Sequence, residues 1–490
     1  MTLFIFAYVL LQMVAAMLLS RRIRTEDDYL VAGRRLGPGL AAFSIFATWF
    51  GAETCIGAAG AVYESGLSAT RGDPFGYTLV IVIVAAVLAV PLWRARITTL
   101  GDLFRARYSP GVERFAVLLM APTSILWAGA QIRAFGQVLA ASSDGLSAST
   151  GVALAAGTVL IYTAFGGMLA DAWSDLVQGV VLAVGLLVMT ALVLQDAGGP
   201  TLAFARVPAG HFDWRAPGET MLEVANRWAI PIVGSIAAQE LISRIVACRS
   251  PEVARRSAWI ASLGYVAIGS LPVALGLMAS AGGLQLDDPE QVLPTLAATH
   301  LPRLGYVLFV GALVSAILST VDSCLLVAGS LISHNLVVPR FPSLTEDGKL
   351  LVARVAVIAS GLSAWWLALA SESVLGLVEE ANGFGSAGIA VILGFALWSR
   401  VGGPRAAAAS LAAGTLVWIA AHFVWPVSWD YLASLAAALG AYLIAASIER
   451  RHRGHGDHRG DRGHRKPGED GEPGEHGVPA GTEGENLART

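Results

Sequence analysis

The sequence predicts an all-α membrane protein that crosses the bilayer about thirteen times. Of its 490 residues, 55% are hydrophobic and only 14% are charged, and the mean hydropathy is +0.62. Soluble domains carry about 25% charged residues, so little of this chain can form one. Apolar segments of about twenty residues, the length that crosses a bilayer, recur along it. They lie near 2–20, 38–62, 73–93, 112–141, 147–168, 173–195, 223–247, 254–280, 303–334, 350–370, 374–398, 404–424 and 429–448.

The basic residues between these segments predict the topology, because cytoplasmic loops are enriched in Lys and Arg. With the N-terminus outside, most basic residues fall inside, and the outer loops 142–150 and 285–290 hold none. The inside set is Arg21, Arg22, Arg24, Arg34, Arg35, Arg94, Arg96, Arg105, Arg107, Arg114, Arg249, Arg255, Arg256, Arg340, Lys349, Arg400 and Arg405. The exceptions are Arg71, Arg206, Arg215, Arg227 and Arg303. We therefore expect the N-terminus outside and the C-terminus inside.

The ninth segment carries polar groups in its middle. Ser315, Ser319, Asp322 and Ser323 are spaced i, i+4, i+7 and i+8, which places them on one helical face. A carboxylate at membrane depth costs about 2.5–3.5 kcal/mol on insertion scales and is tolerated mainly beside a polar interior. Oxygen atoms this close together can coordinate an alkali cation. They can also join two helices by hydrogen bonds, and the segment alone does not decide between these interpretations.

Two segments predict interrupted helices. The second holds Gly51, Gly57 and Gly60 at mid-membrane depth, and the seventh holds Pro231 and Gly234. Breaks of this kind beside a midplane site are typical of secondary transporters built from inverted repeats. The alternative is close helix packing at the glycines. Since the two segments are five spans apart and on opposite topological sides, we expect two five-helix halves related by a pseudo-twofold axis.

Several stretches together resemble the sodium:solute symporter family. They are DDYLVAGRRLGPG, ATWFGAETCIG, TTLGDLFRARYSP, YTAFGGMLADAWSDLVQG, QELISRIVACRSPEVARRS and SAILSTVDSCLLVAGSLI, which cover residues 1–400 in the family's order. The resemblance implies a LeuT-type five-plus-five inverted repeat with an extra leading helix. It also implies alternating access and coupling to a Na⁺ gradient across the plasma membrane. We expect Na⁺ as the coupling ion and no organic cofactor.

The resemblance also implies the ion sites. For the main sodium site it indicates the backbone oxygens of Ala47, Phe50 and Ala316 with the hydroxyls of Ser319 and Thr320. Carbonyls freed by a helix break suit a weakly held monovalent ion. A second cation site in some members corresponds here to Asp175, Ser319, Asp322 and Ser323. Two carboxylates there could bind Na⁺ or a proton, and the alternative for Asp175 is a helix cap that faces the cytoplasm.

Within the family, the local resemblance is to the high-affinity choline transporter branch. It rests on Trp49, Gly76-Tyr77, the stretch 127–132 and Ser319 to Ser323. Aromatic faces bind a quaternary ammonium by cation–π attraction, so Trp49, Tyr77 and Trp127 form a candidate cage. Each of these rings can instead be ordinary packing. The chain departs from that branch at Ala238, where the branch has a tryptophan. The expected substrate-binding residues are Trp49, Glu53, Thr54, Tyr77, Trp127 and Gln239.

These observations define the expected organisation and function. The regions are a leading helix with its cytoplasmic loop at 1–37, a transporter core at 38–400, two further helices at 401–449 and a disordered, Gly- and His-rich tail at 450–490.

We expect a symporter of a small organic solute. A proton-coupled transporter of an amino acid, carboxylate or other solute is the alternative. No repeated channel filter, signalling domain or catalytic set such as HExxH is visible. The expected partners are the solute, sodium and the bilayer, without nucleic acid or an obligate protein.

Overall fold

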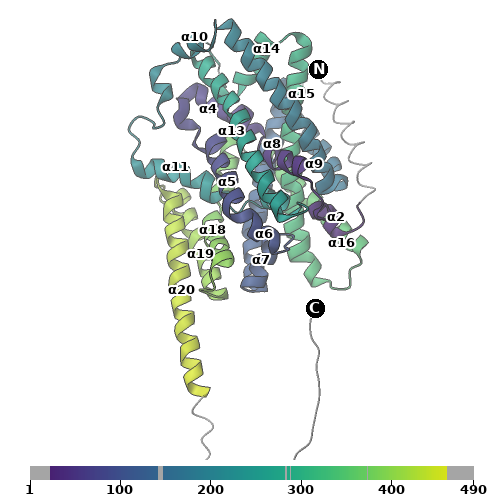
Figure 1. Ribbon diagram of the computed structural model, residues 1–490, viewed down its shortest axis with the longest axis vertical. Coiled ribbons are helices and arrows are strands. Elements are labelled where there is room, and N and C mark those ends of the chain that lie inside the picture. The colour runs from purple at the N-terminus through teal and green to yellow at the C-terminus, as the bar shows by residue number, and fades with distance from the viewer. Residues whose placement is uncertain (1–22, 142–146, 282–283, 287, 372–373, 461–490) are drawn as a thin grey trace, which may run out of the picture.

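The computed structural model describes residues 23–141, 147–281, 284–286, 288–371 and 374–460. Within these ranges the chain is helical, and its β pairing is confined to one bridge between Leu36 and Cys248. Figure 1 shows the helices gathered into one bundle. They are α2 (Glu26–Val31), α3 (Pro38–Ala47), α4 (Ala58–Ser65), α5 (Tyr77–Ile83), α6 (Ala89–Arg94), α7 (Leu100–Arg107), α8 (Pro110–Ala141), α9 (Ala148–Asp196), α10 (Pro200–Ala205), α11 (Met221–Gly234), α12 (Gln239–Val246), α13 (Pro251–Ala281), α14 (Val292–His300), α15 (Arg303–Ser330), α16 (Glu346–Ala370), α17 (Val374–Gly383), α18 (Ser386–Trp398), α19 (Pro404–Ile419) and α20 (Asp430–Gly460).

The membrane character of the chain is confirmed. Among the described residues, 8 helices are long and apolar enough to cross a membrane, or up to 10 if each bent helix pair is one span. These helices coincide with predicted segments. The predicted second segment is divided between α3 and α4, and the fifth lies at the start of α9. The predicted first segment, at 2–20, lies outside the described residues, so the count of about thirteen and the orientation stay predictions.

The predicted break in the second segment is present. Helix α3 ends at Ala47, a π-helical turn covers Glu53–Gly57, and α4 begins at Ala58. At the end of α3 the Thr48 hydroxyl donates to the carbonyl of Ser44 at 2.6 Å. Such side-chain bonds compete with the regular backbone pattern and bend helices. The backbone between α3 and the π-helical turn is therefore available to other partners.

The seventh segment is also broken, and a third break occurs that the sequence analysis did not predict. Helices α11 and α12 meet at a bend of 40°. The same angle separates Gly376–Gly383 from α18. Gly385, which precedes α18, has φ 68°, a left-handed conformation that glycine adopts without steric cost. The eleventh segment thus joins the second and seventh as a source of irregular backbone inside the bundle.

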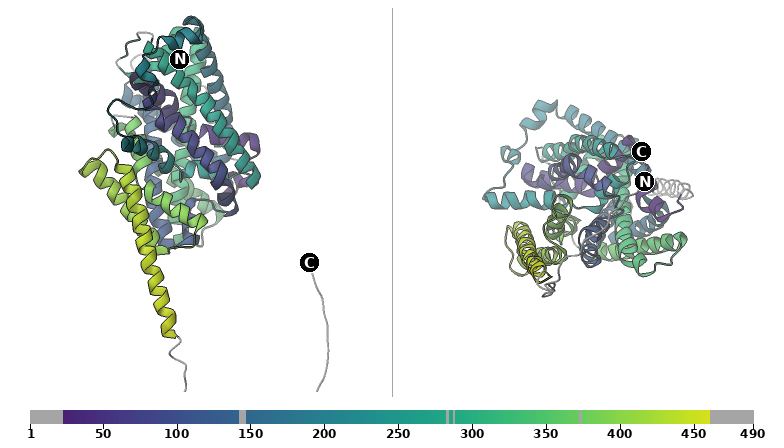
Figure 2. Two further views of the ribbon diagram at one scale, coloured as in Figure 1. Left: turned by 60° about the vertical axis from the view of Figure 1, so that its left-hand side comes forward. Right: turned by 60° about the horizontal axis from the view of Figure 1, so that its bottom comes forward.

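Helix α15 lies in the middle of the bundle, where it packs against α8, α9 and α16, and α13 packs against α3 and α4. The predicted fifth and sixth segments follow one another directly in α9, which turns at Gly167 with φ 64°. Figure 2 shows α19 and α20 at one side, with α20 extending beyond the bundle. Helix α20 continues to Gly460, past the predicted boundary at 450, and the remainder of the tail lies outside the described residues.

Backbone and side-chain contacts close one end of the bundle, which we call the inner end because the sequence analysis places it inside. Leu36 pairs with the backbone after α12 through its N–H to Ala247 and its carbonyl to Arg249, both at 3.0 Å. The Arg34 guanidinium donates to the carbonyls of Val246 at 3.2 Å and Ile97 at 2.8 Å. These bonds tie the segment before α3 to α12 and to the chain before α7.

Candidate functional site

The break after α3 lies against two other helices. The hydroxyl of Ser44 donates to Asp175 Oδ2 at 2.6 Å, and the hydroxyl of Ser319 donates to the other oxygen of the same carboxylate. All three side chains are buried. Asp175 on α9 therefore connects α3 with α15. Its contact on α3 lies about one turn before Ala47, the last residue of that helix. This arrangement excludes the alternative that Asp175 is a helix cap facing the cytoplasm, because its carboxylate is fully buried.

Within the break, the backbone approaches α15. A Cβ on Gly51 would lie 2.8 Å from Thr320 Oγ1 and 2.9 Å from Gln131 Oε1, so a larger residue would displace one of these side chains. Thr320 donates to the carbonyl of Ala316 at 3.2 Å. The irregular backbone thus runs between Ser319 and Thr320 on one side and Gln131 on the other.

All five residues of the expected main sodium site are buried around this break. Ala47 is the last residue of α3 and Phe50 belongs to the irregular backbone after it, whereas Ala316, Ser319 and Thr320 belong to the facing turn of α15. The Ala47 carbonyl accepts the N–H of Phe50 at 3.2 Å. The fold therefore brings the two halves of the expected set to neighbouring positions, with carbonyl and hydroxyl oxygens of the kind a monovalent ion prefers.

The expected second cation site is also assembled, but with two residues that the sequence analysis missed. Asp171 lies one turn before Asp175 on α9, and Arg244 projects from α12. The Arg244 guanidinium contacts the Asp171 carboxylate and the Ser323 hydroxyl directly and lies 3.8 Å from Asp175 Oδ2. The Ser323 hydroxyl also lies 3.2 Å from Asp171 Oδ1. A fixed positive charge therefore occupies part of the space between these carboxylates.

Arg244 and Asp171 each carried a signal in the sequence. Arg244 is a charged residue in the apolar run of α12, where it is completely buried. Charged side chains at such depth pair with one another, so a partner was to be expected. Asp171 precedes Asp175 by four residues, which puts both on one face of α9. Asp322, the remaining carboxylate of the expected set, is buried on α15 beside this pair.

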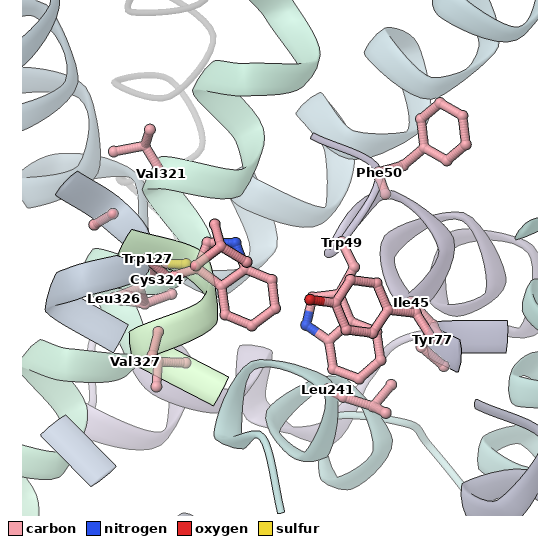
Figure 3. Packing of buried hydrophobic residues seen from close by; sticks show 14 of the residues in the cluster. Ile45, Trp49, Phe50, Tyr77, Trp127, Leu241, Val321, Cys324, Leu326 and Val327 are labelled. Carbon is pink, nitrogen blue, oxygen red and sulfur yellow. The ribbon is translucent and has the colours of Figure 1, made fainter. Parts of the chain in front are cut away.

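The three candidate cage residues meet, although Trp49 comes from the break after α3, Tyr77 from α5 and Trp127 from α8. The ring centroids are 5.1 Å apart for Trp49 and Tyr77, 6.0 Å for Tyr77 and Trp127, and 6.2 Å for Trp49 and Trp127. Figure 3 shows Trp49 and Tyr77 together, with Trp127 across from them. At these separations the rings pack against one another. A solute held between them would have to move them apart or lie on their outer faces.

Glu53 is connected to this aromatic group. Its carboxylate accepts the indole N–H of Trp127 at 3.2 Å and the amide N–H of Gln131 at 2.5 Å. Gln131 in turn accepts the backbone N–H of Ala52 at 3.0 Å. Gln131, which the sequence analysis did not select, therefore satisfies the broken backbone and orients the carboxylate. A polar side chain one turn after Trp127 in an apolar helix was the signal for it.

Thr54 and Gln239, the other two expected substrate-binding residues, form hydrogen bonds within the protein. The Thr54 hydroxyl lies 2.5 Å from Asp73 Oδ2 and 3.0 Å from the hydroxyl of Tyr265, inside the protein. It therefore supports Asp73 and does not face a cavity. Gln239 Oε1 accepts the backbone N–H of Leu100 at 2.8 Å, which connects α12 to α7.

A large cavity opens at the end of the bundle opposite the inner end, and we call it the vestibule. Its volume is ≈ 630 Å³, and it extends from the loops 68–72 and 426–428 to Glu53, Asp73 and Tyr77. These loops are predicted to lie outside. The buried side chains of Glu53, Asp73 and Tyr77 therefore lie at the inner part of a cavity that leads to these loops.

Acidic side chains outnumber basic ones along the vestibule. The charged residues that line it are Glu53, Asp73, Glu223, Glu379, Asp430, Arg71, Arg227 and His422. Both arginines pair with Glu219, at 2.6 Å for Arg71 and 3.3 Å for Arg227. Hydrogen bonds from Arg71 hold the pKa of the Glu219 carboxyl below its ordinary value, so the pair is charged. The two arginines share this one carboxylate, and the five acidic residues of the lining outnumber them, which favours cations in the vestibule.

Sequence comparison agrees with this geometry. The model of the family described as "Sodium:solute symporter family" matches residues 29–414. The chain belongs to the sodium:solute symporter family. Among its relatives is a high-affinity choline transporter 1 of Drosophila melanogaster, 26% identical over 72% of this chain and 59% of that protein. The high-affinity proline transporter PutP of Bacillus subtilis is 28% identical over 78% of this chain and 84% of its own. The present chain spans about three fifths of the length of that choline transporter.

The solved structures show the fold. A Na⁺-coupled sialic acid symporter in a substrate-bound, outward-open state superposes with a TM-score of 0.80 at 18% identity, over 91% of this chain and 96% of the other. Mhp1, a nucleobase-cation-symport-1 family transporter in a closed conformation, gives a TM-score of 0.61 at 16% identity, over 88% and 96%. These superpositions confirm the predicted all-helical, LeuT-type fold. The long apolar helices agree with a multi-pass membrane protein.

Proposed function

We propose that this protein is a sodium-coupled secondary active symporter that imports a small organic cation by alternating access, with choline or another quaternary amine as the solute. The observation that carries the solute class is the acidic vestibule, which reaches Glu53 beside the three contacting aromatic rings. The names of the choline transporter relatives support the same class. We place the protein in the plasma membrane, where such a solute is taken up from outside.

Sodium is proposed to bind at the break after α3. Its ligands are the carbonyls of Ala47, Phe50 and Ala316 and the hydroxyls of Ser319 and Thr320. The close approach of Gly51 to Thr320 supports this assignment, because it brings the broken backbone and α15 together without intervening side chains. Sodium at this position would stabilise the conformation in which the vestibule is open. A ligand shifts such an equilibrium only by its different affinity for the two states.

The second cation set is proposed to work with Arg244. A sodium ion bound by Asp175, Ser319, Asp322 and Ser323 would share these groups with a guanidinium that lies 3.8 Å from Asp175. Two cations this close repel each other in a medium of low polarity. We therefore expect the main site to dominate the sodium dependence, with the second set acting as a weaker site.

The solute is proposed to bind where the vestibule ends. Glu53 supplies the negative charge, and Trp49, Tyr77 and Trp127 supply aromatic faces. Each cation–π contact is worth about 0.5–2 kcal/mol, and more when the site excludes water. Gln239 is proposed to contact the solute from the α12 side, and Thr54 acts through Asp73.

Thermal stability of the purified protein in NaCl and in KCl, each with a panel of solutes, tests this function. A ligand that binds only the folded state raises stability by RT ln(1 + [L]/Kd). A rise specific to sodium that choline enlarges further is the expected result. A sodium rise that only uncharged or anionic solutes enlarge would keep the symporter and overturn the organic cation.

Proton coupling is the alternative, with an amino acid, a carboxylate or another small solute. It is favoured by one observation, the group of buried carboxylates formed by Asp171, Asp175 and Asp322. Such a transporter would take up its solute in sodium-free buffer when a pH gradient is imposed. Sodium-dependent uptake that ignores the pH gradient would exclude it.

A further inference from the structure

A second, smaller cavity lies deeper in the bundle, and we call it the inner cavity. It has a volume of ≈ 40 Å³ and lies at the break between α11 and α12, against α8, α17 and α18. The side chains that matter for its chemistry are Ser124, Trp127, Gln239, Glu240, Asn382 and Phe384. Since a cavity needs about 10–15 Å³ to hold one water molecule, this one has room for a few waters or for a small polar group, and not for a whole solute.

The inner cavity and the vestibule meet at Asn382 and Trp127. Asn382 lines both spaces. Its amide N–H donates to the Tyr77 hydroxyl at 2.9 Å, and its amide oxygen accepts the hydroxyl of Ser235 at 3.1 Å. Trp127 spans the same boundary, because its indole N–H reaches Glu53 while its side chain lines the inner cavity. A solute bound beside Glu53 therefore has the inner cavity next to it.

The inner cavity contains one strong acceptor. Glu240 is buried, with 4% exposure, and the Ser124 hydroxyl donates to its Oε1. Its side chain lines the cavity, and a carboxylate has acceptor sites beyond the one that Ser124 uses. Carboxylates are strong acceptors and repel a second carboxylate at short range.

The inner cavity is also lined by a side chain whose donor has no partner in the part of the chain that the structure describes. Gln239 is 2% exposed, and its Oε1 is used by the backbone N–H of Leu100. Its Nε2 is buried and has no hydrogen-bond partner among the described residues. Buried donors are almost always paired, so an unpaired one on a cavity wall indicates an acceptor supplied from outside the chain.

We propose that the inner cavity binds a hydroxyl group of the solute and that Glu240 is the residue that selects for it. This inference rests on the proposed transport of an organic cation. A hydroxyl donates its proton to the Glu240 carboxylate and accepts the Gln239 N–H, which satisfies both groups with one oxygen atom. The cationic end then lies beside Glu53 and Trp127. The solute class is an amino alcohol, and a betaine is excluded because its carboxylate would face Glu240.

The test measures sodium-dependent binding of choline, ethyltrimethylammonium, which lacks the hydroxyl, and glycine betaine to the full-length protein. We expect choline to bind on the order of tenfold to a hundredfold more tightly than either analogue, as for a hydrogen bond to a charged group. In Glu240→Gln the preference for choline over ethyltrimethylammonium should shrink and betaine binding should rise, because the amide carries no charge and donates. Glu252→Gln, on the exposed start of α13, is the matched control and should leave the order unchanged.

The possible results distinguish a failure of the hydroxyl-site proposal from a failure of the proposed transport function. If choline and ethyltrimethylammonium bind the wild-type protein equally in sodium, the hydroxyl site is overturned and the organic-cation symporter stands. If no quaternary amine binds but a neutral hydroxylated solute does, and Glu240→Gln abolishes its hydroxyl preference, the cation class fails and the hydroxyl site stands. If Glu240→Gln does not fold, Glu240→Asp replaces it. The shorter side chain withdraws the carboxylate, so an unchanged choline preference in that variant would overturn the proposal.

Discussion

The hydroxyl of Ser44 donates to the carboxylate of Asp175 at 2.6 Å, across more than a hundred residues of sequence. This bond fixes the end of α3 against α9 just before the backbone leaves its helical path. The same carboxylate accepts the Ser319 hydroxyl from α15. The buried carboxylate of Asp175 thus holds together the three helices that carry the candidate ion ligands.

Ser319→Ala should lower sodium affinity by about tenfold, because it removes a hydroxyl ligand worth about 1 kcal/mol or more. The apparent affinity for the solute should fall at low sodium and recover at high sodium. Sodium titrations of uptake and of thermal stability measure both effects. Ser330→Ala is the matched control, since that hydroxyl donates to its own helix at 2.8 Å. A normal solute affinity in Ser319→Ala at low sodium would show that the sodium site is wrongly assigned.

Gly51→Ala should abolish most of the sodium response. The added methyl group would lie 2.8 Å from Thr320 Oγ1 and 2.9 Å from Gln131 Oε1, so the Thr320 hydroxyl, a proposed sodium ligand, and the Gln131 amide must move from their positions. The measurement is the stability difference between NaCl and KCl. Gly39→Ala, in α3, is the control because a Cβ there meets nothing within 4 Å. An intact response in Gly51→Ala would mean that this contact does not position the ion ligands.

Arg244→Ala should destabilise the protein by about 3–5 kcal/mol, because it leaves the carboxylate of Asp171 buried without its cation. Thermal unfolding in a fixed detergent and salt measures the loss. The double variant Arg244→Ala, Asp171→Asn should recover part of it, since the uncompensated charge is then removed. Equal stability of Arg244→Ala and the wild-type protein would contradict the ion pair.

Glu53→Gln should weaken binding of a cationic solute by about tenfold or more, since a desolvated charge pair is worth more than the ~1 kcal/mol of an exposed one. The sodium response should persist, because the sodium ligands lie outside this side chain and the glutamine oxygen still accepts one of the two hydrogen bonds, from Trp127 or from Gln131. Solute titrations at saturating sodium provide the measurement. Glu379→Gln, at an exposed position on the vestibule, should have little effect. Similar losses in both variants would indicate general attraction of cations and no specific role for Glu53.

Part of the predicted ion and solute set was selected because polar or aromatic groups stand in unusual places, whereas Ala47, Phe50 and Ala316 were selected from the family resemblance alone. Ser319 and Thr320 stand out on an apolar helix, and the glycines around Glu53 stand out inside a span. Gln131 escaped selection because one amide in a long helix has many possible roles. Glu240 escaped because its position beside Gln239 is informative only once α8 and α17 close a cavity around it.

The sequence by itself determined the membrane class, most of the apolar helices, the breaks in the second and seventh segments and the family. These properties follow from local composition and spacing, which a linear chain displays directly. Only the tertiary structure decided the third break at Gly385, the burial of Arg244 between carboxylates, the contact of the three aromatic rings and the unpaired amide of Gln239. Burial and pairing depend on which helices become neighbours, and packing between distant segments determines those neighbours.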